Sequence, residues 1–419
     1  MRIEVLCTGD ELLTGLTADT NSPFFMEGLL RLGEKVAWSQ TVGDSRADIA
    51  RALREISGRA DAVLVSGGLG PTADDVTLEA AAEVAGVALL EDAAVLEAIR
   101  ARFAARRLVV TPNNARQARV PQGALAVPNP VGSAPLVIQA LGRCTAFFVP
   151  GVPREYRHLV EHEVLPRLAL RLAQDPHRTY RASRLVRTVG LAESHLDAQM
   201  APLVPKHPQV VFGYRTQAPE NHLKLLAEAN SQAEADRALA NAEAEARRVL
   251  GAYVFGVDGQ TFAEVLVRLL EERGATLALG ESCTGGLAAE YVTAVSGASR
   301  VFLGGVVAYA NAMKTQWAEV PPGLLEAHGA VSAPVAEALA AGVRRQAGAT
   351  YGVGITGIAG PTGGTPEKPV GTVFVALAGP SGGASGRYLF GKERERVRQF
   401  AAYTALDMVR RHVLGLPPP

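Results

Sequence analysis

Two glycine-rich loops near opposite ends of the chain could each bind an anionic ligand. One spans residues 66–75 and reads SGGLGPTADD, and the other spans residues 356–365 and reads TGIAGPTGGT. Glycine has no Cβ, so backbone N–H groups can approach and surround an anion. The first loop ends in two carboxylates and suits a metal-bridged phosphate, whereas the second has none and suits a phosphate held by backbone alone. Two different sites in one chain suggest two joined enzymes.

A candidate amide-cleaving site precedes the second loop. The segment ESCTGG at residues 281–286 lies between a predicted strand and a predicted helix, where N–H groups and hydroxyls meet the positive end of the helix dipole. The segment YANAMK at residues 309–314 ends another predicted strand. Ser282 is therefore a candidate nucleophile, Lys314 a candidate general base, and Tyr309 a residue that could relay or orient the proton.

Two other interpretations of these residues stay open. Cys283 competes as the nucleophile, because a helix N-terminus also lowers the pKa of a thiol. Alternatively, Ser282 and Thr284 are helix caps, Tyr309 belongs to the core and Lys314 lies on the surface.

A second set of polar residues follows strands near the N-terminus. Asp10, Asp44 and Asp74 are carboxylates at predicted strand ends, where hard oxygen ligands suit a divalent metal ion such as Mg²⁺. Asp75 fits equally well as a cap for the helix that is predicted to begin near residue 76. Arg116 and Arg154 could contact phosphate oxygens, although structural ion pairs are the commoner role for such residues.

The elements that must position these residues alternate between strand and helix. Strands are predicted at residues 3–8, 36–42 and 62–66, with helices between them, and this order predicts a mainly parallel sheet covered on both faces. Ligands of such sheets bind beyond the carboxyl ends of the strands. From residue 261 the same alternation returns, and it includes a helix that opens directly after Ser282. The fold class is thus α/β, with two separate α/β sandwich domains joined by a small α+β KH-like module.

That module covers residues 171–258, between domains predicted at 1–170 and 259–415. Its predicted order of elements is βαββαβ. It resembles a KH domain, but no GxxG loop lies between its helices, so the feature with which KH domains clamp RNA is missing. We interpret the module as a spacer or dimer element.

Composition limits the function classes. Lys and Arg number 42, as do Asp and Glu, and this zero net charge argues against a nucleic-acid-binding protein. The three cysteines are far apart and indicate no disulfide framework. The N-terminus reads as a strand, and no apolar run is long enough to span a bilayer. We expect a cytoplasmic protein that binds small molecules, neither nucleic acid nor membrane, and forms a homodimer.

The C-terminal motifs resemble those of the CinA C-terminal domain. ESCTGG, the Tyr-x-Asn-x-x-Lys element, TGIAGPTGGT and KPVGTV at residues 368–373 occur in the family's order. The resemblance implies metal-free deamidation of nicotinamide mononucleotide to nicotinate mononucleotide and ammonia. It places the catalytic residues at Ser282, Tyr309 and Lys314. Family members often have Ser at the position of Ala310, so any help from that hydroxyl is absent in this chain. Substrate would contact a further set of residues: Thr284, Gly285, Gly286, Asn311, Gly357, Ala359, Gly360 and Thr365.

The N-terminal motifs resemble the molybdopterin-binding-like domain at the front of CinA proteins. The matching segments include residues 7–13, 19–22, 41–44, 66–75, 113–118, 129–132 and 150–155. The resemblance implies metal-dependent hydrolysis of ADP-ribose to AMP and ribose 5-phosphate. We expect the metal, Mg²⁺ or similar, at Asp10, Asp44 and Asp74. The expected nucleotide contacts are Thr8, Gly9, Asn21, Ser22, Gly67, Gly68, Gly70, Arg116 and Arg154, although Asn21 and Ser22 also read as helix caps.

The sequence therefore predicts a bifunctional pyridine-nucleotide hydrolase. Two rivals remain. The N-terminal domain could be a non-catalytic nucleotide-binding or molybdopterin-type binding module, or the chain could be a competence-related interaction protein. Metal-dependent release of AMP from ADP-ribose would distinguish an enzyme from a non-catalytic binding module.

Overall fold

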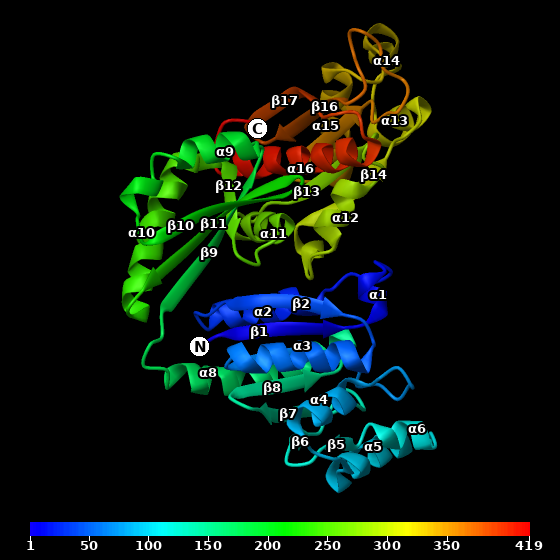
Figure 1. Ribbon diagram of the computed structural model, residues 1–419. Helices are drawn as coiled ribbons and strands as arrows, with labels where there is room; N and C mark the ends of the chain where they lie inside the picture. Colours follow the sequence, from blue (N-terminus) through cyan, green and yellow to red (C-terminus); the bar gives the residue numbers. More distant parts are fainter. The chain divides into compact units, whose positions relative to one another are not determined.

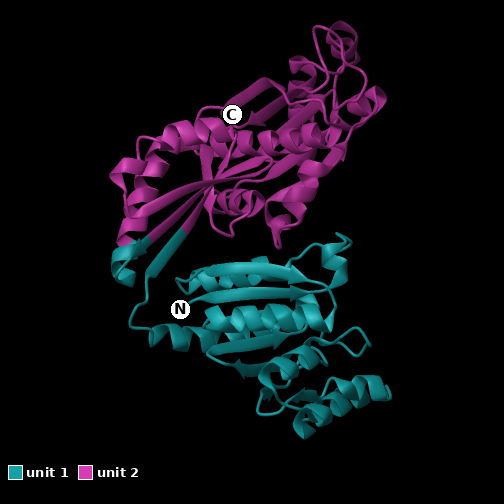
Figure 2. Cartoon of the chain, in the orientation of Figure 1, with its two compact units in different colours: residues 1–183, 228–236 teal, residues 184–227, 237–419 magenta.

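The computed structural model describes residues 1–419, which divide into two compact units. Unit 1 comprises Met1–Ser183 and Glu228–Asp236, and unit 2 comprises Arg184–Ala227 and Arg237–Pro419 (Figure 2). Both contain α/β architecture, as predicted. No helix combines the length and the apolar character that crossing a membrane requires.

Unit 1 is built on a six-stranded sheet with the order β2-β1-β3-β8-β7-β6. The first four strands are parallel, and β7 and β6 continue the sheet antiparallel. The strands are β1 (Ile3–Thr8), β2 (Val36–Val42), β3 (Ala62–Ser66), β6 (Leu125–Val127), β7 (Leu136–Leu141) and β8 (Cys144–Val149). β1, β2 and β3 occupy the predicted residues. A separate antiparallel pair joins β4 (Leu89–Glu91) to β5 (Arg119–Pro121).

Helices cover both faces of this sheet because its central strands are apolar on both sides. Ile3 and Val5 pack into a core with α2 (Asn21–Arg31) and the run formed by α7 (Pro153–Leu159), η1 (Val160–Val164) and α8 (Leu165–Ala173). Leu6 faces the other core, with α3 (Arg46–Arg59) and α4 (Thr77–Ala85). The remaining helices are α1 (Asp10–Leu13), α5 (Ala93–Ala105) and α6 (Pro112–Arg116).

The middle module has the predicted βαββαβ order and forms a sheet with the order β10-β11-β9-β12. Its elements are β9 (Tyr180–Val189), α9 (Glu193–Met200), η2 (Val204–Lys206), β10 (Val210–Gln217), β11 (Glu220–Ala229), α10 (Gln232–Leu250), η3 (Gly251–Tyr253) and β12 (Val254–Val257). The division between the two units passes through β9, β11 and α10.

The C-terminal part of unit 2 has a five-stranded sheet with the order β14-β13-β15-β16-β17. β14, β13 and β15 are parallel, whereas β16 and β17 are antiparallel. The strands are β13 (Leu277–Glu281), β14 (Phe302–Val307), β15 (Tyr351–Gly357), β16 (Thr372–Gly379) and β17 (Gly382–Leu389). α11 (Phe262–Glu272), α12 (Leu287–Thr293) and α16 (Arg394–Val413) share one core with this sheet (Figure 1). On its other face lie α13 (Asn311–Ala318), α14 (Pro322–His328) and α15 (Ala333–Ala347), and η4 (Ala298–Arg300) precedes β14.

Within unit 2, a buried charge cluster joins the middle module to α16. Asp407 accepts hydrogen bonds from Arg410 and Arg411, and all three side chains are almost fully buried. The Arg410 guanidinium also donates to the carbonyls of Ala252 and Val254. A buried charge is tolerated only when its hydrogen bonds are made, so this cluster fixes α16 against the segment that enters β12.

Candidate functional sites

The N-terminal candidate site is a cavity of about 470 Å³ at the carboxyl ends of β1 and β3. The 66–75 loop forms much of its wall. Gly67 has a φ of 109°, and a Cβ there would lie 2.4 Å from Thr8 O. Gly68 has a φ of 65°, and a Cβ there would lie 2.0 Å from Thr77 Oγ1. Only glycine allows the loop to bend this tightly against the end of β1. Eight predicted site residues line the cavity: Thr8, Gly9, Asn21, Asp44, Gly67, Gly68, Gly70 and Asp74.

The predicted metal ligands gather at the strand ends. The Asp10 N–H donates to Asp44 Oδ2 over 3.0 Å, and the Asp44 N–H donates to Asp10 Oδ1 over 3.3 Å. Burial raises the pKa of Asp44, and the nearby negative charges of Asp10, Glu11 and Asp74 raise it further. This excess of negative charge fits a cation. The Asp44 and Asp74 side chains line the cavity, whereas Asp10 does not and instead ties the ends of β1 and β2 together.

Nowhere in residues 1–419 do three or more His, Cys, Asp or Glu side chains form a group that could hold a metal ion. A Mg²⁺-like ion usually takes only one or two carboxylates from a protein and completes its shell with water and substrate phosphate. Asp44 and Asp74 at the cavity wall fit that pattern.

Several other predicted residues have structural partners. Asp75 accepts hydrogen bonds from the N–H groups of Gly70 and Thr72, so it folds the glycine loop and does not cap α4. Arg116 forms an ion pair with Glu79 and donates to two loop carbonyls. It therefore has the structural ion-pair role that was the alternative to a phosphate contact. Arg154 is exposed and lies outside the cavity lining.

The proposed capping roles of Asn21 and Ser22 are wrong. Asp19 Oδ1 accepts from both of their N–H groups, so Asp19 supplies this bond at the start of α2. The Asn21 amide donates to Ser66 Oγ and Gly151 O, and the Ser22 hydroxyl contacts the Cys7 thiol at 3.0 Å. Asn21 therefore braces the cavity wall, and Ser22 lies behind it.

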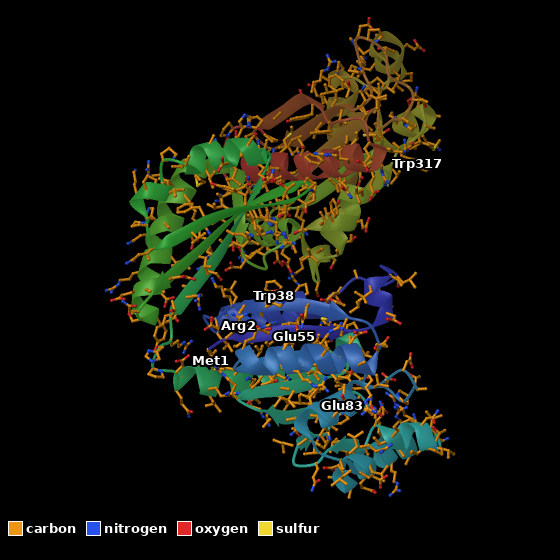
Figure 3. The ribbon with its side chains drawn as sticks, viewed as in Figure 1. Met1, Arg2, Trp38, Glu55, Glu83 and Trp317 are labelled. Atoms are coloured by element: carbon orange, nitrogen blue, oxygen red, sulfur yellow. The ribbon has the colours of Figure 1, made fainter.

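The C-terminal candidate site forms where β13 and β14 end side by side. Ser282 follows β13 and has 8% of its surface exposed, and its N–H donates to Ile355 O on β15. Lys314 lies on α13, the helix that Trp317 marks in Figure 3, and is 1% exposed. The Ala308 N–H donates to the carbonyl of Glu281, the residue before Ser282, and Ala308 O in turn accepts from the Lys314 amine. These contacts bring Lys314 beside the end of β13.

The Lys314 amine is held by the main chain and not by the serine. Nζ donates to Ala308 O over 2.8 Å and to Tyr309 O over 3.1 Å. Burial lowers the pKa of Lys314, because desolvation disfavours its charged form. A neutral amine has two N–H groups and one lone pair, so these two acceptors leave the lone pair free to take a proton.

The cysteine next to the candidate nucleophile is less suited to attack. Cys283 is buried in the apolar core of the unit, and this burial raises the pKa of its thiol to about 12. Since the thiolate is the reactive form, Cys283 is unreactive near neutral pH. The raised pKa of its thiol counts against Cys283 as the nucleophile, and Ser282 stays a candidate.

The helix after Ser282 differs from the prediction. α12 begins at Leu287, because Gly285 and Gly286 turn the chain at φ of 63° and 94° first. The buried Glu281 carboxylate accepts from the N–H groups of Gly286, Ala288 and Ala289. The positive end of α12 is therefore neutralised by Glu281.

The Tyr309 side chain contacts Arg394, a residue that the sequence motifs did not identify. Tyr309 is 60% exposed, and its hydroxyl accepts a 2.9 Å hydrogen bond from Arg394, the first residue of α16. Arg394 also donates to Gly360 O in the second glycine loop over 2.7 Å. Arg394 thus connects Tyr309 to that loop, while the Tyr309 carbonyl holds Lys314.

The other predicted C-terminal residues lie around these groups. Thr284 is fully buried with its hydroxyl unpartnered, and its carbonyl accepts two hydrogen bonds from Arg398. Asn311 is the exposed first residue of α13. Gly357, Ala359 and Gly360 lie at the end of β15 and just beyond it, and Thr365 forms an exposed turn with Lys368.

Together these features define a three-part class of protein: an α/β domain with a carboxylate-lined cavity, a βαββαβ module, and an α/β domain with a buried lysine held by main-chain carbonyls. Sequence comparison agrees with each part. Residues 4–170 match the "Probable molybdopterin binding domain" family, residues 183–256 the "Damage-inducible protein CinA KH domain" and residues 259–413 the "CinA C-terminal domain".

Relatives match the chain along its whole length. A CinA-like protein of Myxococcus xanthus is 56% identical over 418 residues, covering 100% of this chain and 99% of the relative. A CinA-like protein of Anaeromyxobacter sp. strain Fw109-5 is 50% identical over 412 residues, covering 98% of each. The solved CinA protein of Thermoplasma acidophilum is 33% identical, covers 40% of this chain and 97% of that one, and has a TM-score of 0.38. The chain belongs to the CinA family.

Proposed function

We propose that the C-terminal domain deamidates nicotinamide mononucleotide. The observation that carries this proposal is the buried Lys314 amine, whose pKa is lowered and whose two N–H groups are occupied by carbonyls. The lowered pKa makes the neutral, proton-accepting form of this amine more available than that of a surface lysine. Ser282, which directly follows β13, would donate the proton from its hydroxyl.

The reaction would run through an acyl-enzyme. Ser282 Oγ attacks the carboxamide carbon as its proton passes to Lys314 Nζ, forming a tetrahedral intermediate. The C–N bond then breaks, Lys314 returns the proton to the departing ammonia, and an ester to Ser282 remains. Water, deprotonated by Lys314, attacks this ester, and its cleavage gives nicotinate mononucleotide and restores the Ser282 hydroxyl. Arg394, through Gly360 and Tyr309, positions the second glycine loop against the nucleotide.

The N-terminal domain is proposed to hydrolyse ADP-ribose to AMP and ribose 5-phosphate. What supports this is the cavity itself, whose lining includes the glycine loop together with Asp44 and Asp74. A bound divalent metal would neutralise the diphosphate. Asp44 and Asp74 would hold it, and the backbone at Gly68 would orient the phosphates, because the Gly67 N–H already donates to Val149 O.

One product assay tests both halves. The full chain is incubated with each nucleotide, with and without a chelator, and ammonia and AMP are measured. We expect chelator-resistant ammonia release from nicotinamide mononucleotide and chelator-sensitive AMP release from ADP-ribose. If AMP is never released but nucleotide binds, the N-terminal domain is a binding module. If no ammonia appears, the Ser282–Lys314 proposal is wrong.

A further inference from the structure

The N-terminal cavity is lined by a buried side chain, Gln117, whose amide oxygen has no hydrogen-bond partner. Gln117 directly follows α6, is 6% exposed, and lines the cavity together with Leu69 and Gly70 of the glycine loop. Its Oε1 atom is buried and has no hydrogen-bond partner. Such atoms are rare in folded proteins, because a buried acceptor without a partner has lost its hydrogen bond to water.

The orientation of this amide is fixed by the loop. Gln117 Nε2 donates to Leu69 O over 3.1 Å. A carbonyl can only accept, so the NH₂ group must face Leu69 and Oε1 must be the free end. Gln117 therefore has one hydrogen-bond acceptor without a protein partner, in a side chain that lines the cavity and is held by the same loop that would hold a diphosphate.

We propose that Gln117 Oε1 is a specificity-determining acceptor for a hydrogen-bond donor on the nucleoside part of the substrate. The inference rests on the proposed nucleotide-binding role of this cavity. Ionised phosphate oxygens are acceptors and cannot bond to Oε1. The donors on an adenine nucleotide are the ribose hydroxyls and the amino group of the base. Gln117 would thus select the nucleoside, while the backbone at Gly68 binds the phosphates.

The chain offers a matched control for this test. Gln139 on β7 is 7% exposed, its Nε2 donates to Ala140 O over 3.1 Å, and its Oε1 is likewise buried without a partner. It does not line the cavity. Gln117→Met and Gln139→Met therefore remove the same kind of amide with the same loss of one main-chain contact, and they differ in access to the cavity.

The experiment measures AMP binding to the full chain by calorimetry without metal, followed by ADP-ribose kinetics with Mg²⁺. We expect Gln117→Met to weaken AMP binding and raise KM about tenfold, with kcat within about twofold of the parent, because one buried hydrogen bond is lost. Gln139→Met should match the parent in both. Thermal unfolding of the two variants should shift equally, which separates a binding effect from a folding defect.

Ligand analogues identify the donor and need no variant. IMP has a carbonyl in place of the amino group, and the 2′-deoxy and 3′-deoxy forms of AMP each lack one hydroxyl. The parent chain should bind one of these about tenfold more weakly than AMP, and Gln117→Met should lose that discrimination. If the parent binds all of them equally, or Gln117→Met binds AMP as the parent does, the inference is overturned.

Failure of the proposed activity would look different. If the parent binds AMP but never cleaves ADP-ribose, hydrolysis is refuted while the comparison of Gln117 with Gln139 still decides the inference. If the parent cleaves ADP-ribose and Gln117→Met has the same KM, the activity stands and only the inference falls. If the parent binds no nucleotide at all, both fall.

Discussion

Replacing Lys314 by methionine removes the proposed base while keeping the length of the side chain. Loss of a positioned general base costs about 10²- to 10⁴-fold in rate. We therefore expect kcat for deamidation of nicotinamide mononucleotide to fall by at least a hundredfold, with ADP-ribose hydrolysis unchanged. Ammonia release by the full chain, coupled to a colour reaction, measures the first, and AMP release measures the second.

The effect on stability can be worked out from the contacts. Methionine leaves Ala308 O and Tyr309 O without their donor, at about 1–3 kcal/mol for each buried acceptor. It also removes a buried amine, whose desolvation costs several kcal/mol when charged. These changes oppose each other, so the free energy of unfolding should change by no more than about 2 kcal/mol. Lys368→Met is a control for the loss of two main-chain hydrogen bonds at a more exposed site, because the Lys368 amine also donates to two carbonyls, His328 O and Val331 O.

The pH profile gives an independent readout. Because burial lowers the pKa of Lys314, deamidation should rise with pH to a plateau that begins below the ordinary lysine value of about 10.4. Between the folded and unfolded pKa values the unfolded chain binds more protons, so stability should rise with pH there, and Lys314→Met should flatten that rise. Retained deamidation in Lys314→Met would refute the base assignment. Loss of activity together with unfolding would show that Lys314 is structural.

The remaining predictions concern four other residues. Ser282→Ala should abolish ammonia release and spare AMP release, whereas Cys283→Ala should keep most ammonia release; the reverse result would make Cys283 the nucleophile. Asp44→Asn should raise the metal concentration needed for half-maximal ADP-ribose cleavage at least tenfold, and an unchanged metal titration would remove Asp44 from the metal site. Arg394→Gln should raise KM for nicotinamide mononucleotide several-fold by freeing Gly360 and Tyr309, and a fall in Tm with unchanged KM would make Arg394 purely structural.

Strong local signals made much of the fold predictable. β1, β2 and β3 are short apolar runs bounded by turn residues, and they occur at the predicted positions. The sequence did not predict α13 or β17. α13 follows the Tyr309 segment without a recognisable cap, and β17 is glycine-rich with alternating exposure, which gives it little apolar signal. Such elements form because neighbours pair or pack with them.

The candidate sites were predictable as motifs but not as contacts. The glycines and carboxylates of the 66–75 loop were visible in the sequence. Only the three-dimensional hydrogen bonds to Asp75 show that this carboxylate folds the loop. Glu281 and Gln117 lay in recognised motifs, whereas Arg394 lay outside them. The roles of Arg394 and Gln117 come from partners far along the chain, such as Tyr309 and Gly360 for Arg394, and no spacing rule encodes such partners.

The Asp407–Arg410–Arg411 cluster has a practical consequence for dissecting the chain. A fragment that starts at residue 259 would keep both arginines but lose the Ala252 and Val254 carbonyls that Arg410 bonds to. It would also lose Glu220, which accepts a hydrogen bond from Tyr403 of the same helix over 3.0 Å. The stretch where sequence families meet is thus a poor place to cut, and a truncation meant to isolate deamidation should retain β12 and the strand that carries Glu220.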